Sequence, residues 1–259
     1  MEWRARLRPI AEDIVTLDLK ARTMLGMLTP SSNTVLEPVT AAMLADLADV
    51  SAHFGRFRVT EIALSQDALG QFQMEPMLAA AELLSHAKVG AIAWNGTSAS
   101  WLGFENDERL CAAIKARTGI PAASSVMGLN EAFKLKGAKR IGLVSPYTDD
   151  VQERIVDNYA RNGFEIVAER HLGERDNYAF SEFDEDLIYR LSLEVAEAKP
   201  DAITVLCTNM RGAVLAERFE AETGIPLYDS VSTALWQAMR VAGADPTRIK
   251  GWGSLFALK

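Results

Sequence analysis

The chain carries an internal repeat, and a repeat of this kind limits the possible folds more than any single motif does. Three pairs of segments match in the same order along the sequence: 26–30 with 142–146, 91–97 with 202–208, and 118–121 with 223–226. Any one of these matches could arise by chance, but three in register indicate a duplicated unit. The chain is therefore predicted to contain two similar halves related by a pseudo-twofold axis.

Short apolar runs alternate with amphipathic stretches in both halves. The runs expected to form buried parallel strands are 24–28, 90–94, 141–144 and 202–206. The stretches expected to form helices between them include 76–87, 107–117, 151–162 and 183–198. Strand–helix alternation is typical of βαβ units. The predicted fold class is α/β, with two similar α/β domains, parallel sheets related by the pseudo-twofold, and an active site in the cleft between them.

The positions of the repeats also predict a domain organisation. We expect residues 23–122 together with 227–259 to form the first α/β domain, and residues 123–226 to form the second. Residues 1–22 are expected to be an N-terminal extension, either solvated or capping the first domain with an edge strand and helix. This segment alternates charged and apolar residues and lacks the apolar core of a signal peptide.

Composition and charge argue against several classes of protein. The chain has 259 residues and a formal net charge of −8, and its 27 lysines and arginines are scattered. Without a basic stripe to neutralise phosphates, a nucleic-acid partner is not expected. No apolar run approaches the roughly 18 residues of a membrane span, so no membrane partner is expected either.

Cysteine and histidine usage narrows the chemistry further. Two cysteines, Cys111 and Cys207, provide no disulfide framework, which favours a cytoplasmic location. The histidines (His53, His86 and His171) are not spaced as metal ligands, so no metal is expected. No Gly-x-Gly-x-x-Gly follows the first predicted strand, and there is no P-loop Lys-Ser/Thr pair. We therefore expect no nucleotide cofactor.

Four loops are expected to line the cleft. Ligands of parallel sheets bind at the carboxyl ends of the strands, and a twofold makes two such edges face each other. The loops at these edges are 29–34, 95–100, 145–149 and 206–212. They are rich in small hydroxyls and free backbone N–H groups, which suit a carboxylate. Helix capping would explain any one loop, but four at one edge favour a binding site.

Cys207 directly follows a predicted strand, at the position where the repeat places Gly96. Free cysteines are usually buried and inert. At a strand end beside a helix N-terminus, however, the helix dipole can stabilise a thiolate and the thiol can shuttle a proton. Cys111 falls on the apolar face of a predicted helix and is expected to be a core residue.

Aromatic residues and one methionine flank the predicted cleft. Tyr147 would place a phenol at its mouth as a hydrogen-bond donor or acid, the alternative being a turn tyrosine with its hydroxyl in water. Trp94, Trp101 and Met210 would either wall an apolar pocket or belong to the core.

These motifs together resemble one branch of a known superfamily. The segments 29–34, 96–98 and 145–150 and the pair Cys207-Thr208 resemble the maleate isomerases and arylmalonate decarboxylases of the aspartate/glutamate racemase superfamily. The similarity runs from about Leu25 to Phe256. It implies two α/β domains with the site between them, no metal or organic cofactor, and a homodimer, which is common in this superfamily.

The resemblance also implies roles for individual residues. Racemases of the superfamily use two facing thiols, and maleate isomerases keep two cysteines, but here the first position is Gly96. One cysteine after a Gly-Thr-Ser loop resembles the arylmalonate decarboxylases. In those enzymes a hydroxyl and backbone hole holds one carboxylate and the single thiol protonates the enediolate. This chain departs from their Cys-Gly-Gly at Cys207-Thr208-Asn209, whereas residues 31–34 look more like the isomerases, whose asparagine binds a carboxylate.

We therefore predict an enzyme acting at the α-carbon of a small carboxylate or dicarboxylate, with decarboxylation of a substituted malonate as the leading hypothesis. The alternative is maleate-type cis–trans isomerisation, or another isomerase or lyase reaction, with Cys207 as nucleophile. Cys207 is the predicted catalytic residue, and the predicted substrate-binding residues are Ser31, Asn33, Gly96, Thr97, Ser98, Tyr147, Thr208 and Asn209. A two-lobed periplasmic binding protein would share this architecture, but the missing signal peptide and the thiol in the cleft argue against it.

Overall fold

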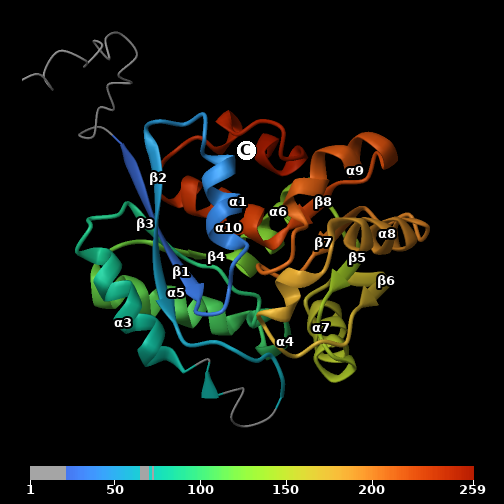
Figure 1. Cartoon of the computed structure of the whole chain (residues 1–259), viewed down its shortest axis with the longest axis horizontal. Coiled ribbons are helices and arrows are strands. Elements are labelled where there is room, and N and C mark those ends of the chain that lie inside the picture. Colours follow the sequence, from blue (N-terminus) through green and yellow to red (C-terminus); the bar gives the residue numbers. More distant parts are fainter. Residues whose placement is uncertain (1–21, 65–69, 72) are drawn as a thin grey trace, which may run out of the picture.

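The computed structural model describes residues 22–64, 70–71 and 73–259. It contains two four-stranded parallel sheets (Figure 1). The first has the order β2-β1-β3-β4 and is made of β1 (Thr23–Pro30), β2 (Val50–Phe57), β3 (Ala91–Trp94) and β4 (Ala122–Ser124). The second has the order β6-β5-β7-β8 and is made of β5 (Arg140–Ser145), β6 (Glu165–His171), β7 (Ala202–Val205) and β8 (Leu227–Asp229). The predicted α/β class with two similar halves is confirmed.

Helices connect the parallel strands. In the first half these are α1 (Leu36–Met43), α3 (Met74–Ser85), α4 (Ala99–Leu102), α5 (Glu105–Thr118) and α6 (Ser125–Lys136). In the second half they are α7 (Asp149–Arg161), α8 (Glu185–Ala196), α9 (Ala216–Thr223) and α10 (Ser230–Val241). Short 3-10 helices cover Ala179–Glu182, Ala213–Leu215, Pro246–Arg248 and Ser254–Ala257. The extension expected at residues 1–22 lies outside the described residues except for Arg22.

The repeated Thr-Gly-Ile-Pro segment is a helix ending that both halves use in the same way. Thr118 donates from its hydroxyl to a carbonyl one turn back in α5 and accepts from the N–H of the isoleucine that follows. Thr223 does the same at the end of α9. Gly119 and Gly224 adopt the left-handed conformation that glycine enters without strain. The chain is thereby turned into the last strand of each sheet.

Helices α6 and α10 meet along the pseudo-twofold, between the two sheets (Figure 1). The Ser125 hydroxyl donates to the Ser230 carbonyl at 2.8 Å, and the Thr233 hydroxyl donates to the Ser125 carbonyl at 3.1 Å. Helix α10 follows the second sheet in sequence but packs on β3 and β4 of the first sheet. The two halves are therefore joined through their equivalent helix N-termini.

The strand pairing assigns a few residues on each side of the expected domain boundaries to the other half. Strand β4 pairs with β3, so residues 123–124 belong to the first sheet rather than the second. Strand β8 pairs with β7, so residues 227–229 belong to the second sheet rather than the first. The repeated segments mark helix ends, and each last strand still completes its own sheet before the following helix begins. The division into two domains stays a prediction.

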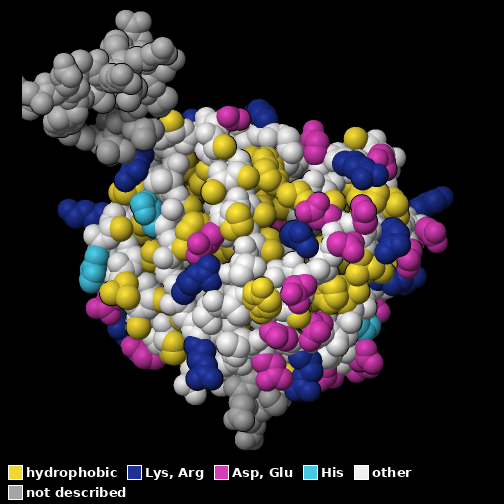
Figure 2. Space-filling model, viewed as in Figure 1, with side chains coloured by type: hydrophobic (Ala, Val, Ile, Leu, Met, Phe, Trp, Pro, Cys, Tyr) yellow, Lys and Arg dark blue, Asp and Glu magenta, His cyan; other side chains and the backbone are white. Residues whose placement is uncertain are grey.

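Surface charge is mixed on the face shown in Figure 2, where lysines and arginines are interspersed with aspartates and glutamates. A duplex-binding stripe would gather the basic side chains along one line. No helix within the described residues is both long and apolar enough to cross a bilayer.

Candidate active site

A small pocket lies where the carboxyl ends of the two sheets face each other. The free space inside it is about 20 Å³. The residues that line it are Pro30, Val59, Ile62, Trp94, Gly96, Thr97, Ser98, Trp101, Tyr147, Asn177, Cys207 and Thr208. They follow or end β1, β2 and β3 in the first half, and β5, β6 and β7 in the second. Both halves therefore contribute three strand ends to one site, as a duplicated α/β unit should.

Six of the nine predicted site residues line this pocket: Gly96, Thr97, Ser98, Tyr147, Cys207 and Thr208. All six are buried, and the Thr208 hydroxyl donates across the interface to the Asn95 carbonyl at 3.1 Å. Trp94 and Trp101 also line the pocket, whereas Met210 is fully buried and does not.

Two predicted residues, Asn33 and Asn209, join the halves beneath the pocket instead of lining it. The Asn33 carboxamide oxygen accepts the backbone N–H groups of Val35 and Leu36 at the first turn of α1, at 3.0 and 2.9 Å. Its amide donates to the Thr208 carbonyl at 2.9 Å. The Asn209 oxygen accepts the Thr34 N–H at 2.9 Å. The hydrogen-bonding groups of both side chains are therefore occupied within the protein.

Ser31, the third residue outside the pocket wall, is bound to the backbone of the neighbouring loop. Its hydroxyl donates to the Val59 carbonyl at 3.3 Å and accepts the Val59 N–H at 3.2 Å. This pair of bonds holds Val59 beside Pro30, where both line the pocket. Ser31 thus shapes the pocket through another residue.

Three lining residues lie outside the loops that the sequence predicted: Val59, Ile62 and Asn177. Val59 and Ile62 follow β2, and Asn177 follows β6. Both segments extend from the carboxyl ends of parallel strands, so the rule that located the other loops applies to them. The signal was missed because neither strand was identified from the sequence.

These two missed loops cover the pocket by pairing with each other. The Ile62 N–H donates to the Arg175 carbonyl at 2.9 Å, and the Asn177 N–H donates to the Thr60 carbonyl at 3.0 Å. Glu61 and Arg175 form an ion pair at 2.8 Å on the outside of this short bridge. The pairing encloses the site between the halves and limits the entry of water.

The Cys207 thiol is deeply buried, with 3% of the residue exposed. Burial is the main cause that raises the pKa of Cys207 to about 12, and the nearby Asp229 carboxyl adds to it. The Asn209 N–H approaches the sulfur at 3.3 Å and opposes this shift. The expectation of a helix N-terminus at the thiol was wrong, because only a three-residue 3-10 helix intervenes before α9 begins at Ala216. The thiol is therefore neutral at physiological pH.

Tyr147 connects the thiol to the Gly-Thr-Ser loop of the other half. Its hydroxyl lies 2.6 Å from the Thr97 hydroxyl and hydrogen-bonds to the Cys207 sulfur. Burial, followed by the neighbouring Cys207, raises the pKa of Tyr147 well above its usual value. The Trp101 ring packs edge-on against the phenol at 5.1 Å. The phenol therefore stays protonated and serves as a hydrogen-bond donor in the pocket, not as the solvated turn residue that was the alternative.

Gly96 faces the indole of Trp94 so closely that a side chain has no room. A Cβ at this position would lie 2.0 Å from Cζ2 of Trp94, inside van der Waals contact. The indole is held from behind by Phe57, at 5.2 Å between ring centres. The position equivalent to Cys207 is thus filled by an aromatic ring from two residues earlier in the chain.

Cys111, as expected, belongs to the core. It is 8% exposed, and its thiol contacts the sulfur of Met127 at 3.7 Å. Burial raises the pKa of Cys111 to about 12 as well. Cys111 does not line the pocket, which makes it a matched reference for Cys207.

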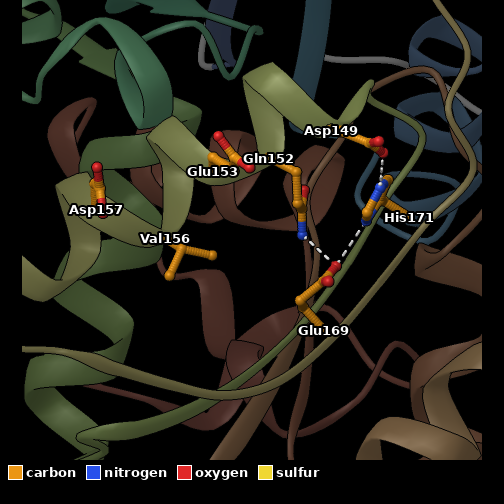
Figure 3. Close-up of a pocket in the computed structure, with 7 residues that line it drawn as sticks. All are labelled: Asp149, Gln152, Glu153, Val156, Asp157, Glu169 and His171. Carbon is orange, nitrogen blue, oxygen red and sulfur yellow. Dashed lines mark hydrogen bonds and ion pairs between the residues drawn. The ribbon is translucent and has the colours of Figure 1, made fainter.

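A second, open hollow lies on the outer side of the second half, between α7 and β6 (Figure 3). His171 lies between Asp149 at 2.7 Å and Glu169 at 2.8 Å, and Gln152 donates to the same Glu169 oxygen at 2.8 Å. Gln152 in turn accepts from the buried Ser145 hydroxyl at 2.7 Å, at the end of β5. Within the described residues, no group of three or more His, Cys, Asp or Glu side chains is arranged to hold a metal ion.

The family model for arylmalonate decarboxylase matches residues 25–256. The chain belongs to the arylmalonate decarboxylase family. Curated relatives of this family member include the arylmalonate decarboxylase of Bordetella bronchiseptica, 25% identical over 90% of this chain and 95% of the relative. The maleate isomerase of Pseudomonas putida is 26% identical over 90% of this chain and 96% of the relative. The predicted resemblance is confirmed, and with it that the protein is an enzyme.

Solved structures of both kinds of relative share the fold. A cysteine-to-serine mutant of Nocardia farcinica maleate cis–trans isomerase, with a covalently bound succinylcysteine intermediate, superposes with a TM-score of 0.82 at 22% identity and covers 90% of this chain and 98% of its own. A glycine-to-cysteine, cysteine-to-serine double mutant of arylmalonate decarboxylase, in the liganded form, gives 0.79 at 22% identity, covering 91% and 98%. The same two-sheet architecture thus occurs in enzymes of two reaction types.

Proposed function

We propose that this protein is a decarboxylase of α-substituted malonates that works without a metal or organic cofactor and protonates the α-carbon with the Cys207 thiol. Both a decarboxylase and several isomerases are among its relatives. One observation favours the decarboxylase: a single thiol lines the pocket, its raised pKa keeps it neutral, and the repeat's equivalent position is Gly96 beside the Trp94 indole. Protonation of a carbanion needs one neutral acid on one face.

Hydroxyl groups from both halves supply the carboxylate hole. Thr97, Ser98 and Tyr147 line the pocket together, with the Thr208 backbone beside them. Donors held in place before the reaction stabilise negative charge without reorganising. The retained carboxylate binds there, and the apolar side chains of Val59 and Ile62 bound the rest of the enclosed pocket.

The reaction then proceeds with a balanced transfer of electrons and protons. The bond between the α-carbon and the second carboxylate breaks, CO₂ leaves, and the electron pair remains on the α-carbon. That pair delocalises into the retained carboxylate, whose growing charge the hydroxyl donors stabilise. The Cys207 S–H proton moves to the α-carbon, and the thiolate regains a proton from water before the next turnover.

The raised pKa of Cys207 favours this chemistry over thiolate addition. A thiol with a pKa of about 12 is almost entirely protonated at pH 7. It serves as a proton donor as it stands, whereas adding to the double bond of maleate would first require the thiol to lose its proton. Tyr147 supports the donor role because its hydrogen bond stabilises the thiolate left after the transfer.

A labelling screen tests the proposal. Phenylmalonate, methylmalonate, maleate and amino-acid enantiomers are incubated with the enzyme in deuterated water and followed by proton NMR. We expect loss of CO₂ from a malonate with one solvent deuteron at the α-carbon of the product, and no exchange with amino acids. Conversion of maleate to fumarate without malonate turnover would replace the proposal with the isomerase alternative.

A further inference from the structure

The indole of Trp94 occupies the space that a side chain at position 96 would fill. An ideal Cβ on Gly96 would lie 2.0 Å from Cζ2 and 2.5 Å from Cε2 and Cη2 of the indole. Real Cβ atoms do not approach other atoms this closely, so glycine at 96 and tryptophan at 94 depend on each other. The six-membered ring of the indole takes the place of a side chain.

The ring is also fixed in position. Trp94 ends β3, is 1% exposed, and packs against Phe57 of β2 at 5.2 Å with an interplanar angle of 45°. A buried ring packed against another ring in a dense core moves only at the cost of its neighbours' packing. The indole is therefore a rigid wall of the pocket that also contains Cys207 and Thr97.

The pocket behind this wall is small. The free space inside it is about 20 Å³, far below the roughly 300–1,000 Å³ typical of sites for drug-sized ligands. A substrate therefore displaces part of the lining when it binds, and every atom of a substituent adds to that displacement. The loop pairing between Ile62 and Arg175 closes the site on another side, so a larger substituent has room only if the indole is reduced.

We propose that Trp94 is the specificity-determining residue of this site and that it limits the size of the α-substituent, favouring a methyl group over an aryl ring. The inference rests on the proposed decarboxylation and adds the substrate class. The mechanism is steric, because the indole closes the side of the pocket that carries Gly96. Trp94 takes no part in proton transfer.

The test compares methylmalonate with phenylmalonate in the wild type and in Trp94→Phe. This variant replaces the two fused rings of the indole with one ring that does not reach as far. The measured quantity is the ratio of kcat/KM for the two substrates. We expect the wild type to prefer methylmalonate, and Trp94→Phe to shift the ratio toward phenylmalonate by about tenfold or more, since small changes of pocket volume alter discrimination by this much.

Trp236→Phe is the matched control. Trp236 is fully buried, packs under Arg240 at 4.4 Å and does not line the pocket. This variant tests the loss of a buried indole as such and should leave the substrate ratio unchanged. An unchanged ratio in Trp94→Phe, or an equal shift in Trp236→Phe, overturns the inference while leaving the decarboxylase proposal intact.

A binding measurement keeps the test independent of turnover and of partial unfolding. Dissociation constants for the two malonates are measured by calorimetry in the Cys207→Ala background, with and without Trp94→Phe, on protein whose thermal unfolding shows it to be folded. We expect phenylmalonate to bind only when Trp94 is replaced. Equal binding of phenylmalonate in both backgrounds overturns the inference, and failure of both malonates to bind overturns the decarboxylase proposal with it.

Discussion

The two halves of the molecule each place an equivalent loop at the pocket, but the side chains that the two loops bring there differ. In the first half the strand ends at Trp94 and the loop continues through Gly96, whereas in the second half the equivalent position is Cys207. Both backbones follow a parallel strand on to a carboxyl edge. One side of the duplicated scaffold therefore carries a thiol and the other a tryptophan wall, and under the proposed mechanism only the first side supplies a proton.

The largest expected effect comes from removing the chemical half of this comparison. Cys207→Ala deletes the thiol that the proposed mechanism uses as proton donor, so turnover should fall by about a thousandfold, within the range of general acid catalysis. Cys111→Ala removes a core thiol whose pKa is raised to the same extent, and it should leave turnover nearly intact. Rates are measured by deuterium incorporation at the α-carbon. Full activity in Cys207→Ala would refute the assigned mechanism.

Adding a methyl group at the wall comes next in size. Gly96→Ala forces a Cβ into the Trp94 indole at 2.0 Å, and overpacking of this kind costs about 1–3 kcal/mol of unfolding free energy. Turnover should fall with it because the displaced indole enters the pocket. Gly90→Ala is the control, since its Cβ would meet nothing closer than 3.5 Å. Denaturant unfolding and kcat are compared, and equal stability of both variants would contradict the close contact.

Tyr147→Phe removes hydrogen bonds between the halves and is expected to reduce activity less than the preceding variants. The variant loses the hydrogen bonds to Thr97 and Cys207 but keeps the ring against Trp101. One lost hydrogen bond at the reacting centre corresponds to about a tenfold fall in kcat, and KM should rise as the carboxylate hole loses a donor. Tyr178→Phe, at a residue that is 51% exposed, serves as the control. A change in Tyr178→Phe as large as in Tyr147→Phe would remove the special role of the buried phenol.

Much of this architecture could be predicted from the sequence because its signals are local. The Thr-Gly-Ile-Pro repeat encodes a helix ending within six residues, and buried runs such as 141–144 encode strands through their own composition. Strands β2 and β6 were missed because both lie at sheet edges, where partly exposed residues interrupt the apolar run.

The same reason explains which parts of the site could not be predicted. Strand ends led to Gly96, Thr97, Tyr147 and Cys207, since the chain order alone brings them to one edge. The collision between position 96 and the Trp94 ring depends on a rotamer packed against another strand. The pKa of the Cys207 thiol depends on how completely both halves bury it. Neither property is carried by any short segment.

The smallest expected effect concerns two histidines on equivalent edge strands. Burial lowers the pKa of His171 in β6, but hydrogen bonds and ion pairs with Glu169 and Asp149 outweigh it, so the pKa is raised (Figure 3). Glu153 and Asp157 lie in the same hollow. The stabilising contribution of His171 is therefore fully present below the usual histidine pKa of about 6.5 and is lost as the pH rises through the raised value. His171→Gln should lower the unfolding free energy by about 0.5–1 kcal/mol at pH 5.5 and by much less at pH 9.

The pKa of His53 in β2 is shifted in the opposite direction. Burial and the nearby Arg22 lower its pKa, so its contribution is present above the usual value and is lost as the pH falls through the lowered one. His53→Gln should therefore lose less stability than the wild type between pH 7 and pH 5. Urea unfolding at three pH values measures both variants. If the two variants show pH dependences of the same sign, the two edge strands do not differ in their electrostatics, and the difference between the halves is confined to the pocket.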